Sequence, residues 1–155
     1  MGCITFFDKP NFEGGSDLQY IYTDFEPYGA NRVFPCFDQP NIKAKMKISL
    51  VTDNTWTAIS NENPMETTMF NKELFRQKSG LEHKGSHDML ETFFAQVNAE
   101  NQKMTMFDYT ELLPTYVYSF AVGPYLFLES SYDNGRIPMK LYCIASVTLM
   151  LGAYS

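Results

Sequence analysis

The sequence predicts a mainly β fold, with antiparallel sheets arranged as a β-sandwich or saddle-like domain and a short helical insertion. Three observations carry this prediction. Residues 43–51 alternate between apolar side chains and lysine or serine, which is typical of a strand with one buried face. Residues 18–25 alternate in the same way and are rich in aromatic side chains. The run Asp133-Asn134-Gly135 is a strong hairpin turn signal ahead of an apolar stretch at 137–143.

The first half of the chain reads as strands joined by tight turns. After the strand at 18–25, Pro35 and Pro40 bracket a predicted rigid turn with a buried cluster of Phe34, Cys36 and Phe37. Residues 43–51 are expected to form one strand that buries Ala44, Met46, Ile48 and Leu50. Beyond Asp53-Asn54, residues 55–60 are expected to return as the second strand of a hairpin, with Trp56 as a core or interface anchor.

Residues 61–102 are more polar, and helical spacing appears within them. A helix is expected to begin at Ser86 and to place apolar side chains on one face, at Met89, Leu90, Phe93, Phe94 and Val97. A weaker helical pattern covers residues 64–76.

Strand patterns then return at 103–108, 115–128 and 137–143. In the second of these, one face is expected to carry Tyr116, Tyr118, Phe120 and Val122. Gly123-Pro124 should interrupt that strand, because proline cannot donate to a sheet ladder.

Two short patterns at the amino terminus have ordinary explanations. Met1-Gly2-Cys3 begins like an acylation site, but Phe6 stands where such a site has serine or threonine. Residues 7–14 resemble a βγ-crystallin Greek-key corner. Because that pattern occurs once, a turn with aromatic flanks is the better interpretation.

Bulk composition excludes several classes of protein. The chain has 155 residues, enough for one domain, and its 12 basic and 18 acidic residues give a net charge of −6, which disfavours a nucleic-acid partner. Three widely spaced cysteines, Cys3, Cys36 and Cys143, suggest neither a disulfide framework nor a cysteine metal site, so a reducing, cytoplasmic location is expected. No stretch reaches the roughly 18 apolar residues of a transmembrane segment, and none resembles a signal peptide.

One motif is far more specific than these patterns. Residues 23–27 read Thr-Asp-Phe-Glu-Pro, and Ala30, Arg32 and the run 34–38 follow in register. The set resembles the T-Q-F-E-P…A-R-x-x-F-P-C-F-D-E-P motif of the aminopeptidase N family of zinc metallopeptidases. Asp24 and Gln39 depart from it, where glutamine and glutamate are usual. Further similarity lies at 56–61, 113–116, 120–123 and 137–143.

The resemblance implies the amino-terminal β domain of such an enzyme, truncated before the catalytic domain. Residues 1–143 would form a partial domain with an insertion at 61–102, followed by a divergent, uncharged tail at 144–155. In the family, the glutamate of this motif binds the protonated α-amine of the peptide substrate, so Glu26 is the expected substrate-binding residue.

Catalytic and metal-binding residues are not expected in this chain. The family's zinc motif H-E-x-x-H and its amine-binding motif G-A-M-E-N do not occur in this sequence. We therefore expect no catalytic residue, metal ligand or cofactor in this chain. The resemblance implies zinc only in the full-length members of the family. His83 and His87 have zinc-helix spacing, but Lys84 replaces the required glutamate and Gly85 weakens a helix. The chain alone is therefore expected to be inactive.

Three functional readings stay open at this point. The chain is a fragment of an aminopeptidase that acts on peptides, a stand-alone β module that binds peptide amino termini or a partner aminopeptidase, or a crystallin-like structural protein. An incomplete sheet would leave strand edges and an apolar face uncovered, which predicts marginal stability and self-association.

Overall fold

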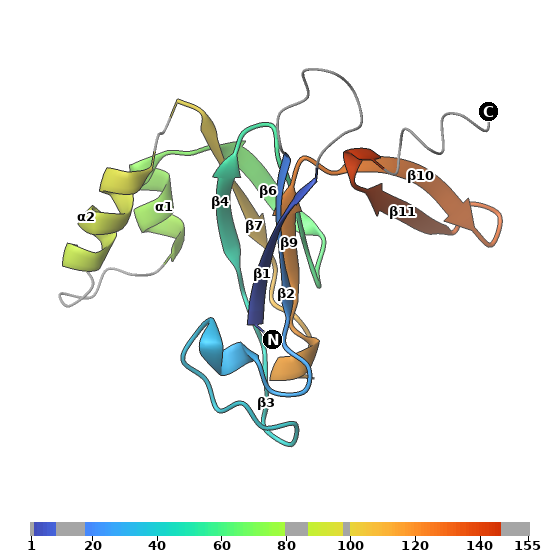
Figure 1. Ribbon diagram of the computed structural model, residues 1–155, viewed down its shortest axis with the longest axis horizontal. Helices are drawn as coiled ribbons and strands as arrows, with labels where there is room; N and C mark the ends of the chain where they lie inside the picture. Colours follow the sequence, from blue (N-terminus) through green and yellow to red (C-terminus); the bar gives the residue numbers. More distant parts are fainter. Residues whose placement is uncertain (1, 9–17, 80–86, 98–99, 147–155) are drawn as a thin grey trace.

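The computed structural model describes residues 2–8, 18–79, 87–97 and 100–146 (Figure 1). These residues form a four-stranded sheet, a three-stranded sheet and two two-stranded ribbons, with antiparallel pairing throughout. Two α-helices lie beside the three-stranded sheet. The predicted fold class, mainly β with antiparallel sheets and a short helical part, is confirmed.

The four-stranded sheet has the order β1-β2-β9-β5, formed by Gly2–Asp8, Leu18–Asp24, Phe120–Gly123 and Thr57–Ser60. β1 pairs with β2 over the full seven residues of each strand. The predicted strand at 18–25 is confirmed, whereas the strand at the amino terminus was missed. The turn expected over residues 7–14 lies mostly outside the described residues.

Gly123 is a glycine because an aromatic ring lies directly against it. A Cβ at this position would come within 2.6 Å of Cδ1 of Tyr20, a completely buried side chain. The ring of Tyr20 stacks on Phe6 at 5.0 Å and meets Tyr125 edge to face at 4.9 Å. The expected interruption after Gly123 is also present, because β9 ends there and β10 begins at Leu126.

The three-stranded sheet has the order β4-β7-β6, formed by Ser49–Asp53, Gln102–Phe107 and Pro64–Met69. The predicted strand at 103–108 is confirmed as β7. The helix predicted over 64–76 is wrong in its first half, because residues 64–69 pair with β7 across a bulge at Met65. Pairing with a buried central strand outweighs a weak helical pattern, and β-branched Thr67 and Thr68 suit the strand.

Two predictions about residues 43–60 are also wrong. The single strand at 43–51 is divided into β3 (Lys43–Ala44), which pairs with β8 (Leu113–Pro114), and β4, which pairs with β7. Met46 and Ile48 between them, which were expected to be buried, are half-buried, and Ala44 is exposed.

The expected hairpin of 49–53 with 55–60 does not form. β5 pairs with β9 in the other sheet, so the chain crosses between sheets at residues 54–56. Asp53 closes this crossing by accepting hydrogen bonds from the Thr55 amide at 2.9 Å and the Thr55 hydroxyl at 2.5 Å.

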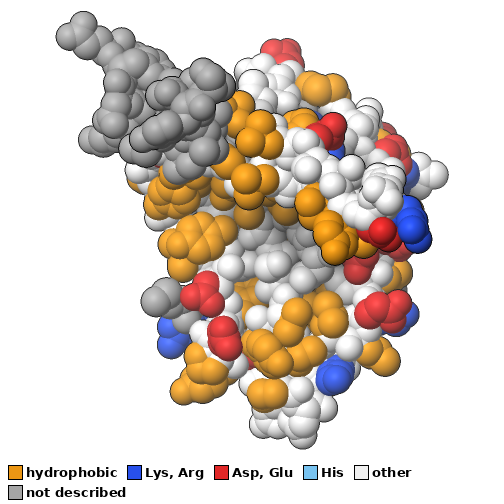
Figure 2. Space-filling model, turned by 90° about the vertical axis from the view of Figure 1, so that its right-hand side faces the viewer, with side chains coloured by type: hydrophobic (Ala, Val, Ile, Leu, Met, Phe, Trp, Pro, Cys, Tyr) orange, Lys and Arg blue, Asp and Glu red, His pale blue; other side chains and the backbone are white. Residues whose placement is uncertain are grey.

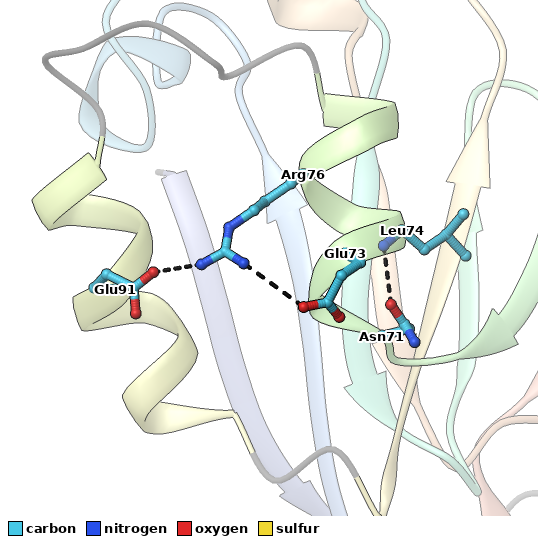
Figure 3. A network of polar contacts seen from close by, with 5 residues as sticks. All are labelled: Asn71, Glu73, Leu74, Arg76 and Glu91. Atoms are coloured by element: carbon cyan, nitrogen blue, oxygen red, sulfur yellow. Dashed lines mark hydrogen bonds and ion pairs between the residues drawn. The ribbon is translucent and has the colours of Figure 1, made fainter.

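The two helices pack on the three-stranded sheet and form one of two hydrophobic cores. α1 (Lys72–Ser79) is capped by the preceding residue Asn71, whose Oδ1 accepts the Leu74 amide at 2.9 Å. α2 (His87–Gln96) confirms the helix expected near Ser86, although Ser86 itself lies outside the described residues. Figure 3 shows Arg76 of α1 between Glu91 of α2 and Glu73 of its own helix. The ion pair of Arg76 with Glu73 spans 3.8 Å. This core is built around Phe70, Phe94, Met104 and Met106.

The other two-stranded ribbon is formed by β10 (Leu126–Tyr132) and β11 (Ile137–Cys143). It stands to one side of the two main sheets (Figure 1). The predicted turn at Asp133-Asn134-Gly135 is confirmed, since all three residues have positive φ and the Arg136 amide donates to the Asp133 carbonyl at 3.2 Å. The predicted strand at 137–143 is confirmed as β11.

Candidate functional site

Glu26 lies in the turn that leads from β2 to the short 3-10 helix η1 (Ala30–Arg32). Its neighbour Phe25 is 2% exposed, whereas Glu26 is exposed to solvent. The Glu26–Pro27 peptide bond is cis, and the Gly29 amide donates to the Phe25 carbonyl at 2.7 Å. The turn thus buries the ring on one side of Glu26 and presents the carboxylate to solvent.

Behind Glu26, the turn is fixed by the second hydrophobic core. Phe25, Ala30 and Tyr118 are its buried members, and Phe34 meets Phe25 edge to face at 5.8 Å. The Tyr118 hydroxyl donates to the Ala44 carbonyl. Burial raises the pKa of the Tyr118 hydroxyl, with a smaller contribution from Cys36, so Tyr118 is a neutral hydrogen-bond donor near neutral pH.

Asp38 fastens the end of the motif to the rest of the domain. One carboxylate oxygen accepts the Asn31 amide at 3.2 Å, and the other accepts the Thr115 hydroxyl at 2.5 Å. Thr115 begins the 3-10 helix η2 (Thr115–Val117), which is 77 residues further along the chain. The motif residue Asp38 is therefore structural, and it joins the Glu26 turn to η2.

Two further side chains, Thr23 and Asn61, bind the backbone of residues 117–120, next to η2. Thr23 Oγ1 accepts the Phe120 amide at 3.0 Å and lies 3.3 Å from the Phe120 carbonyl, to which it donates. Asn61 accepts the Ser119 amide at 2.8 Å and donates to the Val117 carbonyl at 2.9 Å. These roles of Thr23, Asn61 and Asp38 were missed, because each depends on a contact at least 56 residues away in sequence.

The Glu26 side chain is exposed to solvent. Its own amide donates to Asp24 Oδ1 at 3.3 Å, but within the described residues its carboxylate has no hydrogen-bond or ion-pair partner. A carboxylate offers only acceptor oxygens, so its natural ligand is a cationic donor such as an ammonium group.

The predicted Phe/Cys/Phe cluster is only partly buried. Phe34 and Cys36 are half-buried and pack on the second core, but the Phe37 ring is 80% exposed. The alternation of an extended segment explains the difference, because it turns every second side chain away from the core. Burial, together with Asp38, raises the pKa of the Cys36 thiol, which disfavours the thiolate that a nucleophilic cysteine requires.

The described residues bring together no set of ligands of the kind that holds a catalytic zinc. A catalytic zinc needs three protein ligands drawn from histidine, cysteine and carboxylate side chains, and no such group of three comes together in the described ranges. The side chains of His83 and His87 lie outside them, so the prediction that this pair binds no metal stays a prediction. Of the helices that the structure describes, none is long and apolar enough to cross a lipid bilayer.

Comparisons with known proteins agree with the motif. A family model described as the peptidase M1 N-terminal domain matches residues 2–79. Aminopeptidase 2, mitochondrial, of Saccharomyces cerevisiae is 31% identical over 77% of this chain and 9% of its own length. Aminopeptidase 2 of Candida albicans is 29% identical over 92% of this chain and 12% of its own.

The similarity extends beyond fungi. Glutamyl aminopeptidase of Mus musculus is 26% identical over 90% of this chain and 12% of its own length. The chain thus spans between 9% and 12% of the length of these curated relatives. The matched region includes β1, β2 and the whole Glu26 turn, and the chain belongs to the family of peptidase M1 N-terminal domains.

Proposed function

We propose that this chain forms the part of an aminopeptidase that recognises the amino group of the peptide. In this proposal Glu26 accepts hydrogen bonds from the protonated α-amine of a peptide and so selects free amino termini. Hydrolysis would depend on the zinc-bearing catalytic region that the family resemblance implies. The chain by itself would bind but not cleave.

The observation that carries this proposal is an exposed, unpartnered carboxylate on a well-fixed turn. Phe25 and Ala30 anchor the turn in the core, and Asp38 ties it to Thr115. Functional side chains commonly lie on loops that a rigid scaffold positions. A fixed carboxylate loses little conformational entropy when it meets an ammonium group, which favours binding.

Charge explains why a free amino terminus would be selected. A protonated α-amine makes a charge-assisted hydrogen bond to a carboxylate, whereas an acetylated terminus offers a neutral amide. Because Glu26 is exposed and water screens its charge, the contribution in this chain should be about 1 kcal/mol, or about five-fold in affinity. A catalytic region that excluded water would strengthen the same contact.

Titration monitored by NMR tests the proposal. Amide shifts of the 155-residue chain are followed with a short neutral peptide that has a free amino terminus, and then with its acetylated form. The free form should bind about five times more tightly and should shift amides around Glu26. Glu26→Gln, which preserves shape and removes charge, should abolish this preference. Glu111→Gln, at another exposed glutamate, should not.

Equal binding of the two peptides, or an unchanged preference in Glu26→Gln, would overturn the proposal. The affinity also separates two of the functional readings. A dissociation constant on the order of 1 mM for the free peptide would indicate a partial site that needs a second domain. A low micromolar value would favour a stand-alone module that binds peptide termini.

We also propose a reducing compartment such as the cytoplasm. Cys3, Cys36 and Cys143 are all free thiols, and free thiols persist where glutathione and thioredoxin keep them reduced. Oxidative loss of native folding under air, prevented by a thiol reductant, is the expected behaviour.

A further inference from the structure

One face of the β10–β11 ribbon is almost entirely hydrophobic. Residues that pair directly across two antiparallel strands point to the same side of the sheet. In this register Leu128 pairs with Leu141, Ser130 with Met139 and Tyr132 with Ile137. These six residues, together with the pair Leu126 and Cys143, are the apolar face of the ribbon.

The opposite face of the ribbon carries both charged side chains of the two strands, beside Phe127, Tyr142, Ser131 and Pro138. Lys140 lies 2.9 Å from the Glu129 carboxylate and 4.9 Å from the centre of the Phe127 ring. Phe127 in turn lies 6.0 Å from Tyr142. Charge is therefore segregated to one side of the ribbon, as in a sheet that has one wet face and one covered face.

Among the residues that the structure describes, none covers the apolar face. Its six large side chains, which are Leu126, Leu128, Tyr132, Ile137, Met139 and Leu141, are between 45% and 66% exposed. The ribbon projects from the side of the main sheets (Figure 1), and hydrophobic side chains gather on this side of the molecule (Figure 2). A two-stranded ribbon alone is marginally stable in water, so such a face needs a covering layer.

We propose that a second copy of this chain covers the apolar face. The face has no charged residue, so contact between two copies desolvates no ion and opposes no like charges there, despite the net charge of −6. One face can also meet the same face of a second copy across a two-fold axis that lies between the two stacked sheets, which gives an isologous, symmetric contact.

The available area predicts a weak dimer. A fully exposed aromatic side chain presents on the order of 150–250 Å², and aliphatic side chains lie near or below the low end of that range, so six at about half exposure present at most roughly 500 Å². Two faces would bury at most about 1,000 Å², which is near the lower limit of specific interfaces. The dimer should therefore form in the range of tens to hundreds of micromolar and should dissociate on dilution.

Sedimentation equilibrium of the full 155-residue chain, from about 5 to 500 µM, tests this proposal. The wild type should approach twice the monomer mass of 17.8 kDa as concentration rises. Leu128→Lys places a charge in the apolar face and should weaken dimerisation at least ten-fold. Ser131→Lys makes the same addition on the opposite face of the same strand and should change the dissociation constant less than two-fold.

Circular dichroism establishes that each variant is folded. Should Leu128→Lys unfold the chain, Ser130→Lys replaces a polar residue at the centre of the apolar face and is expected to weaken the dimer in the same way. A wild type that stays monomeric at the highest concentration overturns the proposal. A dimer that survives the face variants, or one that Ser131→Lys weakens equally, also overturns it.

Discussion

The hydrogen bond from Thr115 to Asp38 holds the Glu26 turn against η2, and Thr115→Val removes it with little change of shape. The Thr115 hydroxyl lies 2.5 Å from Asp38 Oδ1, and Thr115 is 7% exposed. A hydrogen bond to a charged group contributes about 1.5–3 kcal/mol. Asp38 is half-buried and keeps its bond to the Asn31 amide, so the low end applies. We expect Thr115→Val to lower the free energy of unfolding by about 1.5 kcal/mol.

Urea denaturation measures this change. The fluorescence of Trp56, the single tryptophan, and far-UV circular dichroism should both report a midpoint lowered by about 0.7 M, for a slope of about 2 kcal/mol per molar. In a thermal scan the melting temperature should fall by about 3–6 °C. A protein concentration of about 2 µM keeps the proposed dimer dissociated, so that mass action does not enter the midpoint.

Thr55→Val is the matched control. Its hydroxyl also donates to an aspartate at 2.5 Å, but Thr55 and its partner Asp53 lie at an exposed turn. Water can replace most of that bond, so the urea midpoint should fall much less than in Thr115→Val. If the two valine variants shift the midpoint equally, or if Thr115→Val leaves it unchanged, burial of the Asp38 contact is not what stabilises the turn.

Two further predictions test the packing and the electrostatics of the sheets. Gly123→Ala should lower the free energy of unfolding by about 1–3 kcal/mol, because the new methyl group collides with the buried ring of Tyr20. A urea midpoint of the variant equal to that of the wild type would contradict this. Gly135→Ala meets nothing within 4 Å and should cost about 1 kcal/mol or less, from its positive φ alone. Hydrogen bonds from Thr55 hold the pKa of Asp53 below its usual value. Thr55→Val removes one of these hydrogen bonds, so the pKa of Asp53 should rise. In an NMR titration of the folded protein, the Asp53 carboxylate should become protonated at a higher pH than in the wild type.

Local patterns in the sequence predicted several features of the fold correctly, although the strands expected at 43–51 and 115–128 were too long. The alternation at residues 18–25, the positive-φ turn at Asp133-Asn134-Gly135 and the break after Gly123 are all present in the structure. Each depends on the residues themselves and on their immediate neighbours. A strand period or a turn preference is therefore visible before any partner is known.

Pairing partners could not be predicted in the same way. Thr57–Ser60 follows β4 closely and reads as its hairpin partner, yet it pairs with β9, some 60 residues away. Residues 64–69 form a strand because they pair with the edge of β7 that β4 leaves unpaired. Such choices depend on the burial that the whole sheet achieves, which a short window does not contain.

The structure also explains why Glu26 differs from the other residues of its motif. Phe25, Ala30 and Phe34 pack in the second core, and Asp38 is occupied by Asn31 and Thr115. Packing and hydrogen bonding thus account for these residues without any ligand. Packing and hydrogen bonding do not account for Glu26. Its carboxylate is exposed, has no partner among the described residues and lies on the turn that these contacts fix. The residue that stability does not explain is the one to test for binding.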